Sequence, residues 1–123
     1  MKAILLYGHG ARNPEWAQPF HRIRDAIKAR DPMALVEPGF LELMRPTFDE
    51  GVACLVDQGA TSIVVVPIFM AAGSHVKKDL PRLAADAMDR HEGLLIELAA
   101  PVGEAESVLA AMADYAMRVE PLG

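Results

Sequence analysis

Short apolar runs alternate with longer amphipathic stretches four times along this chain of 123 residues. The apolar runs occupy residues 2–7, 35–43, 61–66 and 94–98, and their aliphatic and β-branched content is typical of buried strands. After each run, apolar side chains recur every three or four residues, which is the period of an amphipathic helix. The pattern predicts a single α/β domain over residues 1–123, three layers thick, with a short, mainly parallel four-stranded sheet.

The helical stretches also carry start and stop signals. Asn13 and Pro14 suit the cap and first turn of the first helix, while Pro46 opens the second helix and Gly59 ends it. The four predicted apolar stripes are Trp16, Phe20, Ile23 and Ile27; Phe48, Val52, Leu55 and Val56; Val76, Leu80, Leu83, Ala84 and Ala87; and Ala105, Val108, Leu109, Met112 and Ala116.

Two of the strand-like runs indicate their place in the sheet. Pro38 and Gly39 interrupt the second run, and a proline cannot donate to a sheet ladder, so we expect this strand at an edge. The third run, residues 61–66, is β-branched almost throughout. That composition is typical of a central strand covered on both faces, which is where we expect it.

Composition and charge narrow the function classes. The chain is 52% hydrophobic and 24% charged, as in an ordinary globular protein. Its formal net charge of −5 argues against a nucleic-acid surface, because phosphate binding needs a basic face. The apolar runs 3–7 and 63–73 are too short for a signal-peptide core and a membrane span. We therefore expect a cytoplasmic protein without nucleic-acid or membrane partners.

Cys54 is the only cysteine, so the sequence holds neither an intrachain disulfide nor a cysteine-rich zinc site. It lies among Val52, Leu55 and Val56. We therefore expect Cys54 to be a buried, unreactive thiol.

The most specific chemical signal is a pair of histidines, each placed just after a predicted strand. His9 follows the first strand and His75 follows the third. The carboxyl ends of parallel strands meet at one edge of the sheet, where ligands bind, so we expect the two imidazoles to converge on one cleft. Neutral imidazole can hold a metal ion or accept a proton near neutral pH. His21 and His91 fall in or after helical stretches, away from that edge.

The same edge is predicted to carry further polar and apolar groups. Glu42 closes the second strand, where it could be a third metal ligand, a base or a solvated carboxylate. A group of cations at this edge of an acidic protein predicts a receptor for a small multivalent anion. These cations are Arg12, Arg45, Lys77 and Lys78, and the apolar side chains beside them are Phe69 and Met70.

Four stretches of the chain, in order and at matching spacing, are similar to a known family. They are residues 8–14 (GHGARNP), 40–46 (FLELMRP), 65–69 (VVPIF) and 72–81 (AGSHVKKDLP). Over nearly its whole length the chain resembles the short-form class II chelatases, the CbiX-type sirohydrochlorin cobaltochelatases. Ala11 stands where relatives commonly have a hydroxyl residue, and Ser74 stands where a second glycine is frequent.

The resemblance implies insertion of a divalent metal, typically Co²⁺, into sirohydrochlorin or a related tetrapyrrole. Ni²⁺, Fe²⁺ or Zn²⁺ are the other candidate substrates, and no organic cofactor is implied. Residues matching His9 and His75 would bind the metal or take pyrrole protons, and Glu42 would assist. Sirohydrochlorin carries eight carboxylates, which Arg12, Arg45, Lys77 and Lys78 would hold while Phe69 and Met70 lie against the ring. The fold implied is a flavodoxin-like half of a two-lobed chelatase, completed by a homodimer.

Two other functions fit parts of the pattern. A carrier that binds metal or tetrapyrrole without joining them would use the same residues, and only turnover separates it from a chelatase. Residues 8–10 (GHG) also resemble the Arg-His-Gly motif of the histidine phosphatases. Phosphoryl transfer in that family needs the arginine, which Gly8 replaces here, so this function is the remote alternative.

Overall fold

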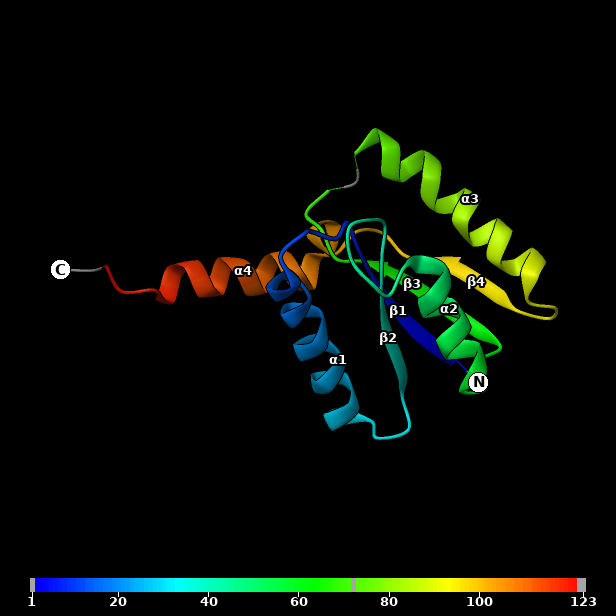
Figure 1. Cartoon of the computed structure of the whole chain (residues 1–123). Helices are drawn as coiled ribbons and strands as arrows, with labels where there is room; N and C mark the ends of the chain where they lie inside the picture. The colour runs from blue at the N-terminus through cyan, green and yellow to red at the C-terminus, as the bar shows by residue number, and fades with distance from the viewer. Residues whose placement is uncertain (1, 72, 122–123) are drawn as a thin grey trace.

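Four parallel β-strands form one sheet in the order β2-β1-β3-β4, as Figure 1 shows. In this computed structural model the described residues are 2–71 and 73–121, and the side chains of Ser74 and His75 lie outside the description. The strands are β1 (Lys2–Gly8), β2 (Leu35–Phe40), β3 (Ser62–Pro67) and β4 (Leu95–Leu98). The helices are α1 (Gln18–Arg30), α2 (Phe48–Asp57), α3 (Ser74–Arg90) and α4 (Glu106–Arg118), with short 3₁₀ turns η1 (Pro14–Ala17) and η2 (Val102–Glu104).

The alternation of strands and helices confirms the predicted α/β class and the position of β2 at an edge of the sheet. β2 is shorter than predicted, because the chain turns away after Phe40. Leu43 in this turn has a φ of 68°, a left-handed conformation that does not continue a strand. The second helix begins at Phe48 rather than at Pro46, with Thr47 and Glu50 forming a capping box.

One face of the sheet is covered by α2 and α3. Alternate residues of the central strands, such as Leu5 and Val65, point to this face and are fully buried. They pack with Val52 and Leu55 of α2 and with Leu80 of α3 in a single apolar cluster. This cluster is the main core of the molecule, and it fixes the direction in which the strand ends point.

The opposite face is covered only in part. α1 lies over the β2 side, where its Phe20 ring meets Phe40 edge-on at 4.9 Å. Val64 and Val66 of β3 point to the same face and remain partly exposed, and the Leu95 side chain of β4 is 53% exposed. The prediction that β3 is covered on both faces is therefore wrong, because α4 runs away from the sheet instead of lying on it (Figure 1).

Cys54 is exposed, so the prediction of a buried thiol is also wrong. Successive helix positions are rotated by about 100°, and this places Cys54 outside the apolar stripe that holds Val52 and Leu55. Its Sγ lies 3.6 Å from Oε2 of Glu37, and the side-chain amide of Gln58 donates to the same carboxylate oxygen at 2.9 Å. In the described part of the chain, no helix is long and apolar enough to cross a membrane.

Tyr7, near the end of β1, is the largest fully buried side chain of the core. Its ring packs edge-on against Phe48 and Phe69, with centroid distances of 5.8 and 6.1 Å. Burial raises the pKa of the Tyr7 phenol to about 12, and the negative charges of Asp79 and Glu42 raise it further. The hydroxyl is therefore neutral throughout the physiological range and lies close to two carboxylates.

The raised pKa of Tyr7 makes stability depend on alkaline pH. The unfolded phenol has a pKa near 10, so the contribution of Tyr7 is fully present below about pH 10 and is lost as pH rises toward about 12. We predict that the free energy of unfolding falls by about 2–3 kcal/mol over this window and that Tyr7→Phe removes this component. Denaturant unfolding at a series of pH values measures it, with Tyr115→Phe as the exposed control. Identical alkaline slopes for the wild type and Tyr7→Phe would contradict the assignment.

Candidate functional site

His9 stands exposed at the carboxyl end of β1 because the glycines on either side of it allow very close packing. A Cβ at Gly8 would overlap the ring of Phe20, so only glycine lets α1 approach the strand end this closely. Gly10 has a φ of +89°, and a Cβ there would overlap the backbone oxygen of Glu42. The GHG motif is therefore a packing device that brings two neighbouring segments against the histidine.

The segment that follows β2 runs beside His9. The backbone N–H of Leu41 donates to the carbonyl oxygen of Gly8 at 2.9 Å, and that of Glu42 donates to the carbonyl of His9 at 3.1 Å. The Glu42 side chain is exposed, and its charge acts on the Tyr7 phenol. The structure thus places a carboxylate next to the His9 backbone.

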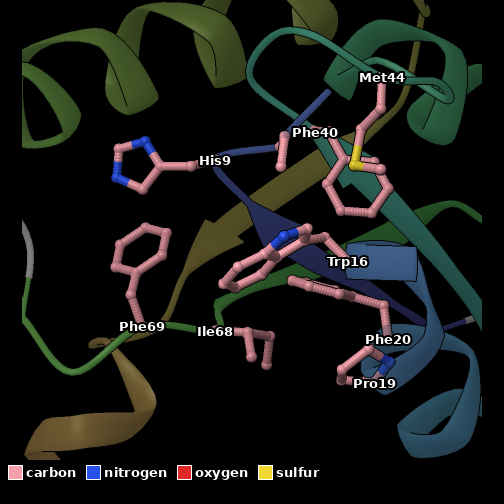
Figure 2. A pocket seen from close by; sticks show the side chains of 10 residues that line it. His9, Trp16, Pro19, Phe20, Phe40, Met44, Ile68 and Phe69 are labelled. Carbon is pink, nitrogen blue, oxygen red and sulfur yellow. The ribbon is translucent and has the colours of Figure 1, made fainter. Parts of the chain in front are cut away.

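A cavity of about 430 Å³ opens beside His9, between the end of β1, the start of α1 and the segments that follow β2 and β3. Figure 2 shows the aromatic rings of Trp16 and Phe20 on one side of this cavity and the His9 and Phe69 rings on another. The lining residues are His9, Gly10, Ala11, Trp16, Pro19, Phe20, Phe40, Met44, Ile68 and Phe69.

The walls of the cavity are almost entirely apolar, and its main polar side chain is the imidazole of His9. The His9 ring lies 5.2 Å from the Phe69 ring, centroid to centroid, with an interplanar angle of 41°. Trp16 is 64% exposed, which is unusual for the largest apolar side chain unless it meets a ligand or partner. The arrangement suits a flat, largely apolar ligand that presents a reactive centre to the imidazole.

The predicted cations are spread around this edge and do not line the cavity. Arg45 is engaged by Glu50, with a hydrogen bond of 3.0 Å from Nε to Oε1, and this interaction lowers the pKa of Glu50 to about 2. Arg12 is exposed in the bend after Gly10. Lys77 and Lys78 are exposed in the first turns of α3.

Lys77 and Met70 belong to a different part of the edge. Lys77 lines a second, smaller cavity of about 270 Å³ between α3, the end of β4 and η2. Met70 is exposed, and its backbone lies against Gly103 of η2. Of the predicted residues, the large cavity therefore brings together only His9 and Phe69.

The side chain of His75 lies outside the described residues, so its predicted convergence with His9 stays a prediction. Its backbone is in the first turn of α3, which follows β3. β1 and β3 are paired in parallel up to Tyr7 and Pro67, and the backbone N–H of Ile68 donates to the carbonyl of Tyr7 at 2.8 Å. Among the side chains that the structure describes, no group of three or more histidines, cysteines and carboxylates could hold a metal ion.

Several residues of the site are not evident from the sequence. Helical spacing assigns Trp16 to the apolar stripe of the first helix, whereas it lies in η1 and lines the cavity. Pro19 inside that stretch is the available signal that the helix starts late and leaves Trp16 in a separate turn. Met44 carries no signal of its own. Asp79, whose charge acts on Tyr7, lies one helical turn after His75.

Comparison with known proteins gives a consistent result. A family model described as CbiX matches residues 3–118. The sirohydrochlorin cobaltochelatase of Sulfolobus acidocaldarius is 35% identical over 123 residues, a match that covers 98% of this chain and 96% of that protein. The sirohydrochlorin ferrochelatase of Bacillus subtilis is 34% identical over 111 residues and is covered over 42% of its length.

Some relatives are considerably longer than the region they share with this chain. The sirohydrochlorin cobaltochelatase of Methanocaldococcus jannaschii is 38% identical over 92 residues, which is 75% of this chain and 64% of that protein. That of Methanopyrus kandleri is 40% identical over 83 residues, which is 68% of this chain and 58% of that protein. The chain therefore spans less than two thirds of these relatives.

Solved structures have the same fold. A CbiX protein from Marinobacter aquaeolei VT8 superposes with a TM-score of 0.82 at 28% identity, and 95% of each chain is covered. The sirohydrochlorin chelatase SirB from Bacillus subtilis subspecies spizizenii, solved in complex with cobalt, superposes with a TM-score of 0.78 at 34% identity. The match covers 96% of this chain and 50% of SirB.

The close approach at Gly10 predicts a specific cost of substitution. Gly10 and Gly59 both have positive φ, but a Cβ at Gly59 would meet nothing within 4 Å. We predict that Gly59→Ala lowers the free energy of unfolding by about 1 kcal/mol, through backbone strain alone, and that Gly10→Ala lowers it by at least about 2 kcal/mol. Urea denaturation of both variants measures the difference. Equal losses would show that the segment carrying Glu42 does not pack tightly on Gly10.

Proposed function

Because the chain belongs to the CbiX family, we propose that it is a chelatase that inserts a divalent metal ion into sirohydrochlorin or a related tetrapyrrole. The observation that carries the proposal is the apolar, aromatic-lined cavity of about 430 Å³ with the exposed His9 imidazole in its wall. Such a cavity offers its apolar walls to a flat macrocycle and a basic nitrogen to the metal or to a pyrrole proton.

The walls of the cavity supply binding and orientation. Trp16 and Phe69 carry the aromatic surface that would lie against the macrocycle, and aromatic pairs of this kind prefer offset or edge contacts. Sirohydrochlorin carries eight carboxylates, which have to stay in solvent near positive charge. Arg12, Lys77 and Lys78 are exposed around the same edge of the sheet and would hold them. A macrocycle fixed in this way presents its central nitrogens in one orientation.

Insertion has two chemical requirements. The metal ion has to lose water molecules, and two pyrrole N–H protons have to leave as the metal–nitrogen bonds form. In our proposal the neutral imidazole of His9 acts as a temporary metal ligand or as the acceptor of a pyrrole proton, and His75 acts as its second member. The Glu42 carboxylate, which stands next to the His9 backbone, assists by attracting the cation or the released proton.

The metal we expect is Co²⁺. Relatives of this chain are named cobaltochelatase and ferrochelatase, and SirB was solved with cobalt. Imidazole and carboxylate groups also accept Ni²⁺, Fe²⁺ and Zn²⁺, so affinity alone does not select among them. Insertion rates measured with each ion in turn, under anaerobic conditions, identify the preferred substrate.

We further expect the chain to act in the cytoplasm as a homodimer. Its match to SirB covers only half of that longer chain, whereas the Sulfolobus acidocaldarius relative is matched over nearly its full length. Two copies of a single-domain chain would supply two walls around one macrocycle, as two lobes of a longer chain would.

The proposal makes His9 essential for turnover. We predict that His9→Ala lowers the rate of Co²⁺ insertion at least about 100-fold, because a general base or ligand at the reacting centre contributes about that much. His75→Ala is expected to do the same, while His91→Ala, at the far end of α3, keeps near-normal activity. The visible spectrum of sirohydrochlorin with added Co²⁺, corrected for spontaneous insertion, gives the rates. Turnover within about twofold of wild type in His9→Ala would remove His9 from the mechanism.

Trp16 provides a direct reporter of binding because it is the only tryptophan of the chain. We predict that metal-free sirohydrochlorin quenches tryptophan emission in a saturable way. Trp16→Ala should raise KM several-fold more than it lowers kcat, since the ring contacts ground and transition states alike. Trp16→Phe, which keeps an aromatic ring, serves as the matched control for the kinetics. Emission that is insensitive to the tetrapyrrole would place the substrate elsewhere.

A further inference from the structure

Half of one sheet face has no helix over it in the described part of the chain. Val64 and Val66 of β3 point to this face and are partly exposed. On β4 the Leu95 side chain is 53% exposed, and Glu97 is exposed beside it. An aliphatic surface of this kind on a central strand is normally buried, since parallel sheets are covered on both faces.

The same chain carries an amphipathic helix that covers nothing. No residue of α4 is buried, and Figure 1 shows α4 running away from the sheet. Its apolar residues Leu109, Met112 and Tyr115 are exposed. An exposed apolar stripe of this length in a folded protein marks an interaction surface.

Topology shows where a helix in this position belongs. The step from β1 to β2 runs toward one edge of the sheet and the steps to β3 and β4 run toward the other, so right-handed crossovers place α1 on one face and α2 and α3 on the opposite face. A helix leading back from β4 toward the centre would, by the same handedness, lie on the face of α1. That place is the uncovered area over β3 and β4.

A packed contact directs α4 away from its own sheet. The backbone N–H of Gly103 in η2 donates to the carbonyl oxygen of Phe69 at 3.1 Å. A Cβ at Gly103 would overlap the backbone of Met70, so η2 lies directly against the segment that follows β3. α4 therefore starts at the carboxyl edge of the sheet, next to the candidate site, and points outward (Figure 1).

We propose that two copies of this chain exchange their α4 helices, with each α4 lying on the uncovered β3–β4 face of the partner. One chain thus supplies both the vacant surface and the helix that fits it. The 13 residues of α4 span about 20 Å, and the six residues of β3 also span about 20 Å, so the helix matches the length of the face.

Charge and area agree with this occupant. The apolar stripe of α4 contains no acidic residue, because Glu106 and Asp114 lie off the stripe, so α4 can approach Glu97 without like-charge contact. The exchange also forms the contact twice, which doubles the buried area toward the about 1,200–2,000 Å² of stable interfaces. Because α4 starts beside Phe69 and Met70, the exchange would bring the carboxyl edges of the two sheets toward each other.

The first test is the mass of the full chain in solution, measured by sedimentation velocity without metal or tetrapyrrole. We expect the wild type at twice the chain mass of 13.3 kDa. Met112→Glu, on the apolar stripe, should raise the dimer dissociation constant at least about 100-fold. Met117→Glu is the matched control, since Met117 lies off the stripe and is 86% exposed. A monomeric wild type, or equal dimerisation of both variants, would overturn the proposal.

The second test identifies the surface that α4 contacts. Cys54→Ser removes the only thiol, and Val66→Cys and Leu109→Cys then place one thiol on the open sheet face and one on α4. A short bis-maleimide should link the two positions into a covalent dimer, while each single-cysteine variant stays monomeric under denaturing conditions. A link within one chain would show that α4 folds back on its own sheet. That result, or the absence of any link, would overturn the exchange.

The exchange deepens the homodimer that forms part of the proposed function, but its tests contain no substrate. A monomer that inserts metal would overturn the exchange and leave the chelatase proposal standing. An exchanged dimer without insertion activity would do the reverse.

Discussion

The close approach of three segments at the end of β1 is the constraint on which the site depends. Gly8 admits the ring of Phe20, Gly10 admits the backbone of Glu42, and their N–H and carbonyl groups join the two strand ends. Because both sides of His9 are fixed in this way, the imidazole has one place to stand, at the wall of an apolar cavity. Positioning of this kind is what metal transfer requires, since the reacting atoms must meet with little reorganisation.

The division of labour within the site follows from its chemistry. Apolar and aromatic walls bind a flat ligand through area and shape, and they contribute no charge that would trap a metal ion. Imidazole and carboxylate groups are confined to the mouth, where the Tyr7 phenol stays neutral because it is buried near Asp79 and Glu42. In the proposed mechanism, binding and metal transfer are therefore functions of different residues, and the family membership of the chain agrees with such a site.

The sequence predicted the fold class and the edge position of β2, because strand–helix alternation and a strand proline act locally. It did not predict which surface each apolar stripe covers. Periodicity identifies an apolar face on α4 but does not say that η2, held by Gly103, points that face away from the sheet. Trp16 was misplaced for a related reason, since helical spacing continues through η1 although the chain axis changes there. Cys54 shows that neighbours in sequence are not neighbours on a helix surface.

The central claim is that His9 performs the chemistry while the cavity walls perform the binding. A single-turnover experiment tests it most directly: wild type and His9→Ala are mixed with metal-free sirohydrochlorin and Co²⁺, with Trp16 emission reporting binding and visible absorbance reporting insertion. We predict similar quenching of Trp16 in both proteins and insertion only in the wild type. Loss of quenching in His9→Ala, or insertion at the wild-type rate, would contradict the claim.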